Sequence, residues 1–166
     1  PLISASAKGF TGGSQEKKRR AGTENVPGVL AFAEAVSISW QTMNEKRELY
    51  QEFKKTMISI WEESKIPFQV NGTMESTLPH ILNVSFEGTD VESLLVNLDM
   101  EGLSVSSGSG CKAGSIDPSH VLVAMFGEEA HELRDSIRFS FGYGVTIEDD
   151  IEAANITVKV IQRLVK

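Results

Sequence analysis

A long helical pattern near the start of the chain is the feature that most limits how these 166 residues can fold. Apolar residues over 29–60 recur at three- and four-residue steps, which is the spacing of one face of an amphipathic helix. Asn25 is placed to cap the helix, and Pro27 suits its first turn. A continuous helix over 27–64 would be roughly 55 Å long, more than the core of so small a domain needs. The pattern therefore predicts either a break near 43–44 or a helix that reaches another body.

The apolar stripe of this helix is predicted to pack against other elements rather than to hold a cofactor. Its members are Val29, Phe32, Val36, Trp40, Met43, Leu49, Phe53, Met57 and Ile60.

Beyond Pro67 the pattern changes to short strands that alternate with helices. Leu82, Val84 and Phe86 alternate with polar residues, which predicts a half-buried strand. The predicted strands cover 68–70, 81–86, 103–106 and 136–141, and the predicted helices cover 91–101, 117–125, 128–134 and 146–165. The last helix is predicted to be capped by Thr146 and to face inward with Ile147, Ile151, Ala154, Val158, Ile161 and Val165. The fold class is therefore α/β, an α+β domain with a small mixed or mostly antiparallel sheet of three or four strands covered by helices.

Composition excludes several classes of function. The net charge of −7 would repel nucleic acid and anionic membranes, and no apolar run approaches the ~20 residues of a membrane span. A single cysteine excludes an internal disulfide and a cysteine-only zinc site, and it suits a reducing compartment, so we expect a cytoplasmic protein. The three histidines lack the close spacing of a metal site, so we expect no metal.

The cysteine, Cys111, lies in a glycine- and serine-rich stretch over 105–118. Such a stretch cannot pack a core, and a buried structural cysteine usually has apolar neighbours. Lys112 follows directly, and a nearby cation favours the thiolate. A nucleophilic cysteine and a surface loop that happens to carry a cysteine are both compatible with this composition. His120 lies nine residues further on and is a conceivable partner base, whereas His131 is expected to be solvated.

Arg138 is the second residue with possible chemistry. It lies on a predicted strand, on the face opposite the apolar residues Ile137 and Phe139, with Ser140 beside it. An arginine in this position is either a structural ion-pair partner or a bidentate hydrogen-bond donor to a carboxylate or phosphate.

Several segments, in one order along most of the chain, resemble the NifS/IscS-type cysteine desulfurases, which are fold-type I pyridoxal-phosphate enzymes of the class V aminotransferase group. The segments are Gly-Gly-Ser-Gln-Glu at 12–16, Arg-Ala-Gly-Thr-Glu-Asn-Val-Pro-Gly at 20–28, His-Ile-Leu-Asn-Val-Ser-Phe at 80–86, Ser-Ser-Gly-Ser-Gly-Cys at 106–111, and the stretches 117–122 and 136–142. Gly110 departs from the alanine that is usual in the family.

The resemblance implies a role for three residues. Cys111 would be the nucleophile that takes sulfur from L-cysteine, which gives L-alanine and a cysteine persulfide. Arg138 would bind the substrate carboxylate, and Thr23 would reach the phosphate of pyridoxal 5'-phosphate across a homodimer interface. The implied partner is a sulfur acceptor, either an iron–sulfur scaffold or a tRNA-thiolation protein.

The resemblance also implies a domain organisation. Residues 1–26 would be a largely irregular remnant of the large cofactor-binding domain, 27–64 the helix or helix pair that links the domains, and 65–166 the small domain. No lysine here matches the family's Schiff-base lysine, and the chain does not begin with methionine. We therefore expect a C-terminal piece of a longer enzyme that, alone, neither binds the cofactor nor releases sulfur.

Two alternatives stay open. The parent could be a selenocysteine lyase or another β-lyase of the same group. The chain could instead be a non-catalytic sulfur-relay or interaction module, in which Cys111 accepts sulfur from a separate enzyme.

Overall fold

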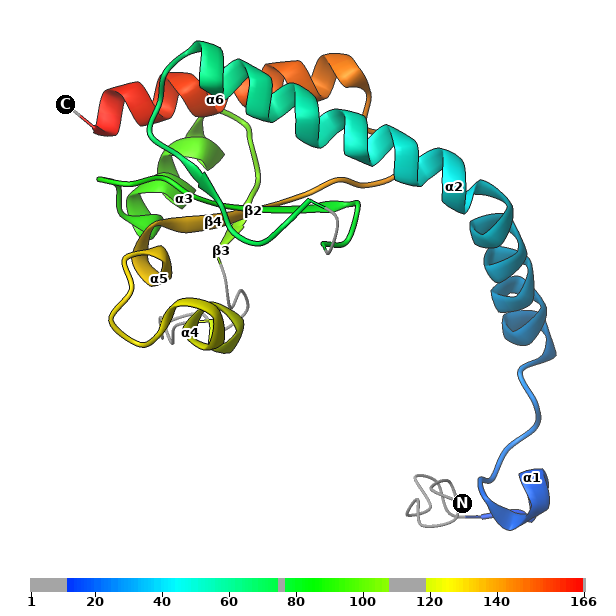
Figure 1. Ribbon diagram of the computed structural model, residues 1–166. Coiled ribbons are helices and arrows are strands. Elements are labelled where there is room, and N and C mark those ends of the chain that lie inside the picture. The colour runs from blue at the N-terminus through cyan, green and yellow to red at the C-terminus, as the bar shows by residue number, and fades with distance from the viewer. Residues whose placement is uncertain (1–11, 75–76, 108–118, 166) are drawn as a thin grey trace. The chain divides into compact units, whose positions relative to one another are not determined.

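The computed structural model describes residues 12–74, 77–107 and 119–165 (Figure 1). The chain divides into two compact units, Pro1–Met43 and Asn44–Lys166, and each is considered by itself. Cys111 therefore lies outside the described residues.

The first unit contains α1 (Gln15–Lys18) and the beginning of α2 (Val26–Glu63). Asn25 caps α2 as predicted, because its Oδ1 accepts a hydrogen bond from the Gly28 N–H at 3.1 Å. Of the two predicted alternatives for this segment, the unbroken helix is the one observed.

The apolar stripe of α2 is buried only in the second unit. Phe53 and Met57 are enclosed there, whereas Trp40 in the first unit is 75% exposed. Val29, Phe32, Val36, Trp40, Met43 and Leu49 of the stripe are exposed in this chain, so only the later part of the stripe packs here as predicted. The periodicity identifies which face of a helix is apolar, but it does not say where along the helix another element covers that face.

The second unit is built on a four-stranded sheet with the order β1-β2-β4-β3, and every neighbouring pair is antiparallel. This confirms the predicted small, mostly antiparallel sheet. Its strands are β1 (Gln69–Val70), β2 (Ile81–Ser85), β3 (Ser106–Ser107) and β4 (Ser136–Ser140). The third strand begins three residues later than predicted, so Leu103–Val105 precede it.

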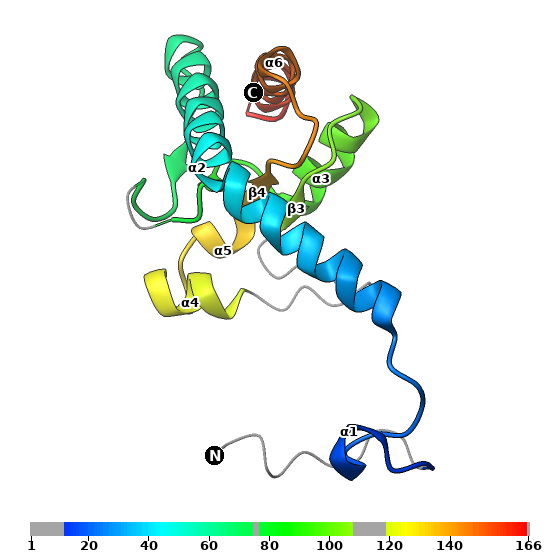
Figure 2. The same cartoon turned by 90° about the vertical axis from the view of Figure 1, so that its right-hand side faces the viewer.

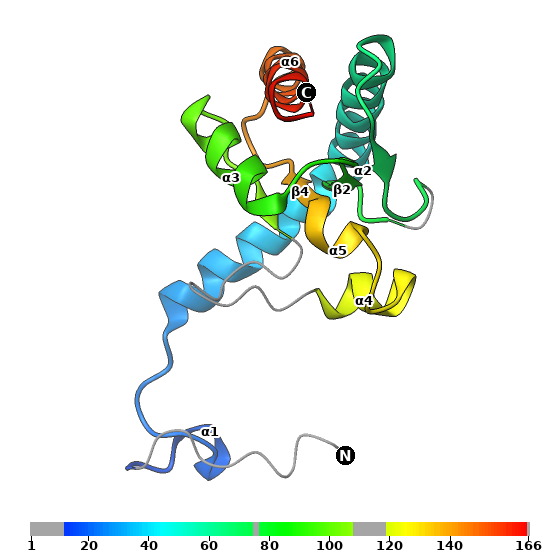
Figure 3. The same ribbon diagram turned by 90° about the vertical axis from the view of Figure 1, so that its left-hand side faces the viewer.

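Helices cover both sides of the sheet. They are α3 (Val91–Met100), α4 (His120–Phe126), α5 (Glu132–Asp135) and α6 (Ile147–Leu164). In all three views, α6 and the 44–63 part of α2 lie on one side, and α4 and α5 lie on the other (Figures 1, 2 and 3). The predicted helix over 128–134 is shorter than expected, because α5 begins only at Glu132.

The hydrophobic core lies between the sheet and α2, α3 and α6. Trp61 stands at its centre, with ring centroids of Phe68, Phe86 and Phe139 at 5.4–5.5 Å. The Trp61 Nε1–H donates to the Ala154 carbonyl at 3.3 Å, which ties α2 to α6. The buried residues of the core include Met57, Leu82, Val84, Leu94, Leu98, Ile137, Val160 and Ile161.

The start of α6 is as predicted, but its inward face is not. Thr146 and Asp149 form a reciprocal capping box at the N-terminus. The predicted stripe fails at Ile151 and Val165, each of which is 40% exposed. The buried positions include two polar residues instead, Asp150 and Thr157. A pattern that counts only apolar residues misplaces the inward face of a helix whose inward positions include polar side chains.

Candidate functional site

The sheet has a polar face opposite its core, as the alternation of β2 and β4 predicted. Leu82 and Val84 of β2 and Ile137 and Phe139 of β4 are buried in the core. The intervening positions carry the polar residues Asn83, Ser85, Ser136 and Arg138. This polar face is the side on which α4 and α5 lie (Figure 3).

Three polar residues form one row across this face. Arg138 of β4 is in direct register with Asn83 of β2 on one side and with Ser106 of β3 on the other. Directly opposed residues in antiparallel strands share a face, with Cβ atoms about 4.5–5.5 Å apart. The row therefore brings a guanidinium, a carboxamide and a hydroxyl together, all of which can donate hydrogen bonds.

Arg138 has an unmet hydrogen-bonding capacity. Its Nε is buried and has no hydrogen-bond partner among the described residues, and no described carboxylate forms an ion pair with it. A buried donor without a partner costs about 1–3 kcal/mol, and the cost is greater for a charged group. The described part of the chain thus offers no support for a structural ion pair of Arg138.

The row lies beside the segment that contains Cys111. The chain passes from Arg138's neighbour Ser106 to Ser107 and then enters residues 108–118, which lie outside the described residues. Cys111 is four positions beyond Ser107 along the chain and lies outside the described residues.

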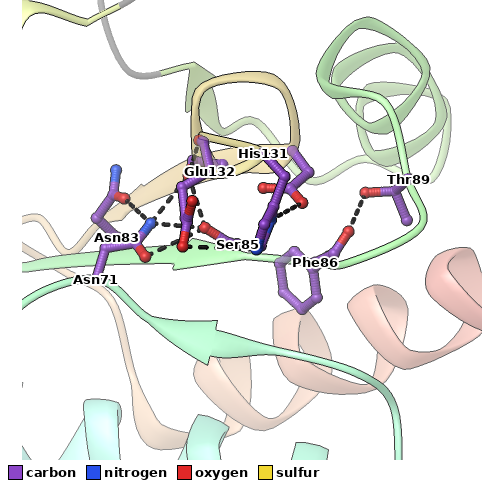
Figure 4. A network of polar contacts seen from close by, with 9 residues as sticks. Asn71, Asn83, Ser85, Phe86, Thr89, His131 and Glu132 are labelled. Atoms are coloured by element: carbon purple, nitrogen blue, oxygen red, sulfur yellow. Dashed lines mark hydrogen bonds and ion pairs between the residues drawn. The ribbon is translucent and has the colours of Figure 1, made fainter. Parts of the chain in front are cut away.

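A buried network of amides and hydroxyls lies next to the row (Figure 4). The Asn71 Nδ2 donates to Asn83 Oδ1 at 2.7 Å and to the hydroxyls of Ser85 and Ser136, both at 2.9 Å. The Ser85 hydroxyl donates to Asn71 Oδ1 at 3.1 Å. The role of Asn71 as the centre of this network had no signal in the sequence.

His131 is exposed, as predicted, and it also pairs with a carboxylate. Its Nδ1 lies 2.9 Å from Asp135 Oδ2, and its side chain remains 55% exposed. The hydrogen bond to Asp135 raises the pKa of His131, and burial raises the pKa of the Asp135 carboxyl. This pair spans α5, from its N-cap residue His131 to its last residue Asp135, which directly precedes β4.

Thr23 and His120 are both described, and each is exposed within its own unit. Thr23 lies in the first unit, in the irregular segment before α2, where its side chain is exposed. His120 is the first residue of α4 and is also exposed. A His120–Cys111 pair would involve a residue outside the described ranges and stays a prediction.

The burial of two charged residues, Lys54 and Asp150, has no signal in the sequence, because each lies in a helix of ordinary composition. Lys54 is 1% exposed, and its Nζ donates to the Leu78 carbonyl at 2.7 Å and to the Thr77 hydroxyl at 3.2 Å. Burial lowers the pKa of Lys54. Asp150 is 2% exposed, and neither carboxyl oxygen has a partner among the described residues. Burial raises the pKa of Asp150 to about 7.

The sequence pattern of the aminotransferase class-V family matches residues 3–153. The chain belongs to the aminotransferase class-V family. Within it, the chain is 54% identical over 153 residues to the putative cysteine desulfurase IscS 1 of Bacillus subtilis (strain 168) and covers 40% of that protein, with 92% of this chain matched. It is 38% identical over 157 residues to the cysteine desulfurase IscS of Dictyoglomus turgidum, covering 38% of that protein and 93% of this chain.

Two solved structures of NifS-like proteins share the fold. A NifS-like protein superposes with a TM-score of 0.75 at 25% identity, over 93% of this chain and 39% of that one. The NifS-like protein from Rickettsia africae ESF-5 gives a TM-score of 0.73 at 26% identity, over 94% of this chain and 40% of that one. The chain thus spans about two fifths of the length of these relatives.

Two further classes of site find no support in the described ranges. No cluster of three or more His, Cys, Asp or Glu side chains there could hold a metal ion. Within the same ranges, no helix has the length and apolar character needed to cross a membrane.

Proposed function

We propose that the chain forms the nucleophile-bearing part of a pyridoxal-phosphate-dependent cysteine desulfurase, which converts L-cysteine to L-alanine and a cysteine persulfide. The observation that carries the proposal is the pairing of Arg138 with Ser106, because it sets a guanidinium whose Nε has no partner among the described residues next to the strand that leads to Cys111. Membership of the aminotransferase class-V family and the cysteine desulfurases among its relatives support the same function.

Arg138 binds the carboxylate of the substrate in this account. A guanidinium presents a planar fork that matches the two oxygens of a carboxylate, and such charge-assisted pairs are stronger than neutral hydrogen bonds. Burial of the Nε on the sheet holds the fork in one place, so the substrate is oriented as well as bound.

Cys111 supplies the nucleophile. Its thiolate forms a bond to the sulfur of the substrate, and the bond between that sulfur and the substrate's β-carbon breaks. The electron pair stays with the carbon, which takes up a proton to give alanine, and the sulfur remains on Cys111 as a persulfide. The neighbouring Lys112 favours the thiolate that begins this step. The persulfide then passes to a sulfur acceptor, an iron–sulfur scaffold or a tRNA-thiolation protein.

The cofactor requires residues from two sources. When bound, pyridoxal phosphate supplies an electron-withdrawing ring that accepts electron density from the substrate. Thr23, whose exposed side chain is open to a ligand, would hold its phosphate from the second subunit of a homodimer. Lys54 is a poor candidate for the lysine that binds the cofactor, because its amine already bonds Thr77 and Leu78 in the core. By the resemblance to the family, that lysine would lie on polypeptide beyond these 166 residues.

The test is alanine formation from L-cysteine by the complete holoenzyme and its Cys111→Ser variant. The variant should lose nearly all alanine formation while it keeps cofactor and substrate binding. Unchanged alanine formation would refute the proposed role. A much greater rate on selenocysteine than on cysteine would assign the protein to the selenocysteine lyases instead, and sulfur loading only in the presence of a separate desulfurase would indicate a relay module.

A further inference from the structure

Asn83 occupies the position on β2 directly opposite Arg138, on the side away from Ser106. Its Oδ1 accepts the hydrogen bond from Asn71 Nδ2 at 2.7 Å. Its own Nδ2 points away from Asn71 (Figure 4) and donates to no other described residue. Asn83 thus presents two free N–H groups on the polar face, beside the guanidinium.

The orientation of this carboxamide is fixed by its surroundings. Asn71 is 5% exposed, and the Ser136 hydroxyl beside it donates its one hydrogen to the Glu132 carbonyl, so this hydroxyl must accept from Asn71 Nδ2, which is the end that also faces Asn83. If the Asn83 amide were turned over, two NH₂ groups would face each other without an acceptor. The network therefore holds the Asn83 oxygen toward Asn71 and its nitrogen outward.

We propose that Asn83 is a second substrate-binding residue, whose side-chain N–H donates to the same carboxylate that Arg138 binds, with Asn71 as its positioning residue. This inference rests on the proposed function. A carboxylate has about four lone-pair sites, and a bidentate arginine occupies two of them, which leaves room for a further donor. The Cβ atoms of opposed residues lie about 4.5–5.5 Å apart, so two such side chains can converge on one small anion.

Binding of L-cysteine and of cysteamine, which lacks the carboxylate, tests the inference. The holoenzyme with Cys111→Ala binds both ligands without turnover. Adding Asn83→Ala should raise the Kd of L-cysteine about tenfold, as expected for one hydrogen bond to a charged group, and leave that of cysteamine within about twofold. Asn83→Asp keeps the acceptor for Asn71 but loses the outward donor, so it should weaken L-cysteine binding even if Asn83→Ala folds poorly.

Two further variants complete the design. Asn71→Ala should raise the Kd of L-cysteine by a smaller factor, because it frees the Asn83 amide to rotate. Asn155→Ala is the matched control: this exposed side chain donates to the Ile151 carbonyl of α6 and should change neither Kd.

The outcomes separate the inference from the function on which it depends. Weaker L-cysteine binding in Arg138→Ala but not in Asn83→Ala or Asn83→Asp would overturn the role of Asn83 alone. Equal weakening of L-cysteine and cysteamine by Asn83→Ala would also overturn it, because the effect would not depend on the carboxylate. Unchanged L-cysteine binding in Arg138→Ala would overturn the carboxylate site itself and the inference with it.

Discussion

Arg138 of β4 and Ser106 of β3 are paired directly in register across antiparallel strands. β3 is an edge strand of the sheet, and the chain leaves it after Ser107 toward Cys111. A ligand held by the arginine is therefore bound at the edge from which the cysteine segment departs. This relationship relates the proposed carboxylate-binding residue to the proposed nucleophile, which lies 27 residues earlier in the sequence.

Replacement of Arg138 should mainly weaken substrate binding. In the complete holoenzyme, Arg138→Ala removes a bidentate charged contact, and we expect the apparent KM for L-cysteine to rise about 100-fold with a smaller change in kcat. Arg138→Lys should be intermediate, because an ammonium keeps the charge but not the fork. Steady-state kinetics measure both effects. A KM that stays at its wild-type value in Arg138→Ala would contradict carboxylate binding by this residue.

The two tryptophans should differ sharply in their contribution to stability. Trp61 is enclosed by three aromatic rings and donates to Ala154, so Trp61→Ala should cost about 3–5 kcal/mol of unfolding free energy. Trp40 is 75% exposed in this chain, and Trp40→Ala should stay within about 0.5 kcal/mol. Urea denaturation of the two variants measures the difference. Similar losses for both would mean that the core is not organised around Trp61.

Asp150 should make the chain less stable as the pH rises. Its pKa is raised by burial from 3.8 to about 7, so between these values the folded chain retains a proton that the unfolded chain releases. Its contribution to stability is therefore greatest below about pH 4 and is lost progressively up to about pH 7. Asp150→Asn cannot ionise and should raise the Tm at pH 8 relative to wild type, with little change at pH 4. An equal Tm difference at both pH values would exclude ionisation of Asp150 as the cause.

The neighbouring Asp149 provides a control, because its effect on stability changes with pH in the opposite direction. The pKa of Asp149 is lowered, mainly by the hydrogen bond from the Thr146 backbone N–H. The stability that Asp149 contributes is therefore present above the pKa of the unfolded chain and is lost as the pH falls. Asp149→Ala should lower the Tm at neutral pH, and this deficit should shrink in acid. If Asp149→Ala and Asp150→Asn shifted the Tm in the same direction at pH 8, the pH account of α6 would be wrong.

Much of the sheet was predictable, because its strands are buried on one face only. Leu82, Val84 and Phe86 alternate with polar residues, and this alternation identified both the core face and the face that carries Arg138. The caps at Asn25 and Thr146 were predictable for a similar reason, since a cap depends on a few neighbouring residues.

The remaining features depend on contacts between distant residues. Nothing beside Asn71 in the sequence indicates that it would bond Asn83, Ser85 and Ser136. The inward positions of Asp150 and Thr157 break the apolar period of α6 for the same reason, because burial is decided by the elements that pack against a helix. Cys111, Arg138 and Thr23 were assigned roles through resemblance to the family, and those roles remain proposals.

The central claim is that Cys111 receives sulfur from L-cysteine, and mass spectrometry of the complete holoenzyme tests it most directly. After reaction with L-cysteine and no reductant, the peptide that contains Cys111 should carry one additional sulfur atom, in proportion to the alanine formed. The Cys111→Ser variant should carry none and form almost no alanine. Alanine formed at the wild-type rate by that variant, or a persulfide on Cys111 that appears only when a separate desulfurase is added, would contradict the account.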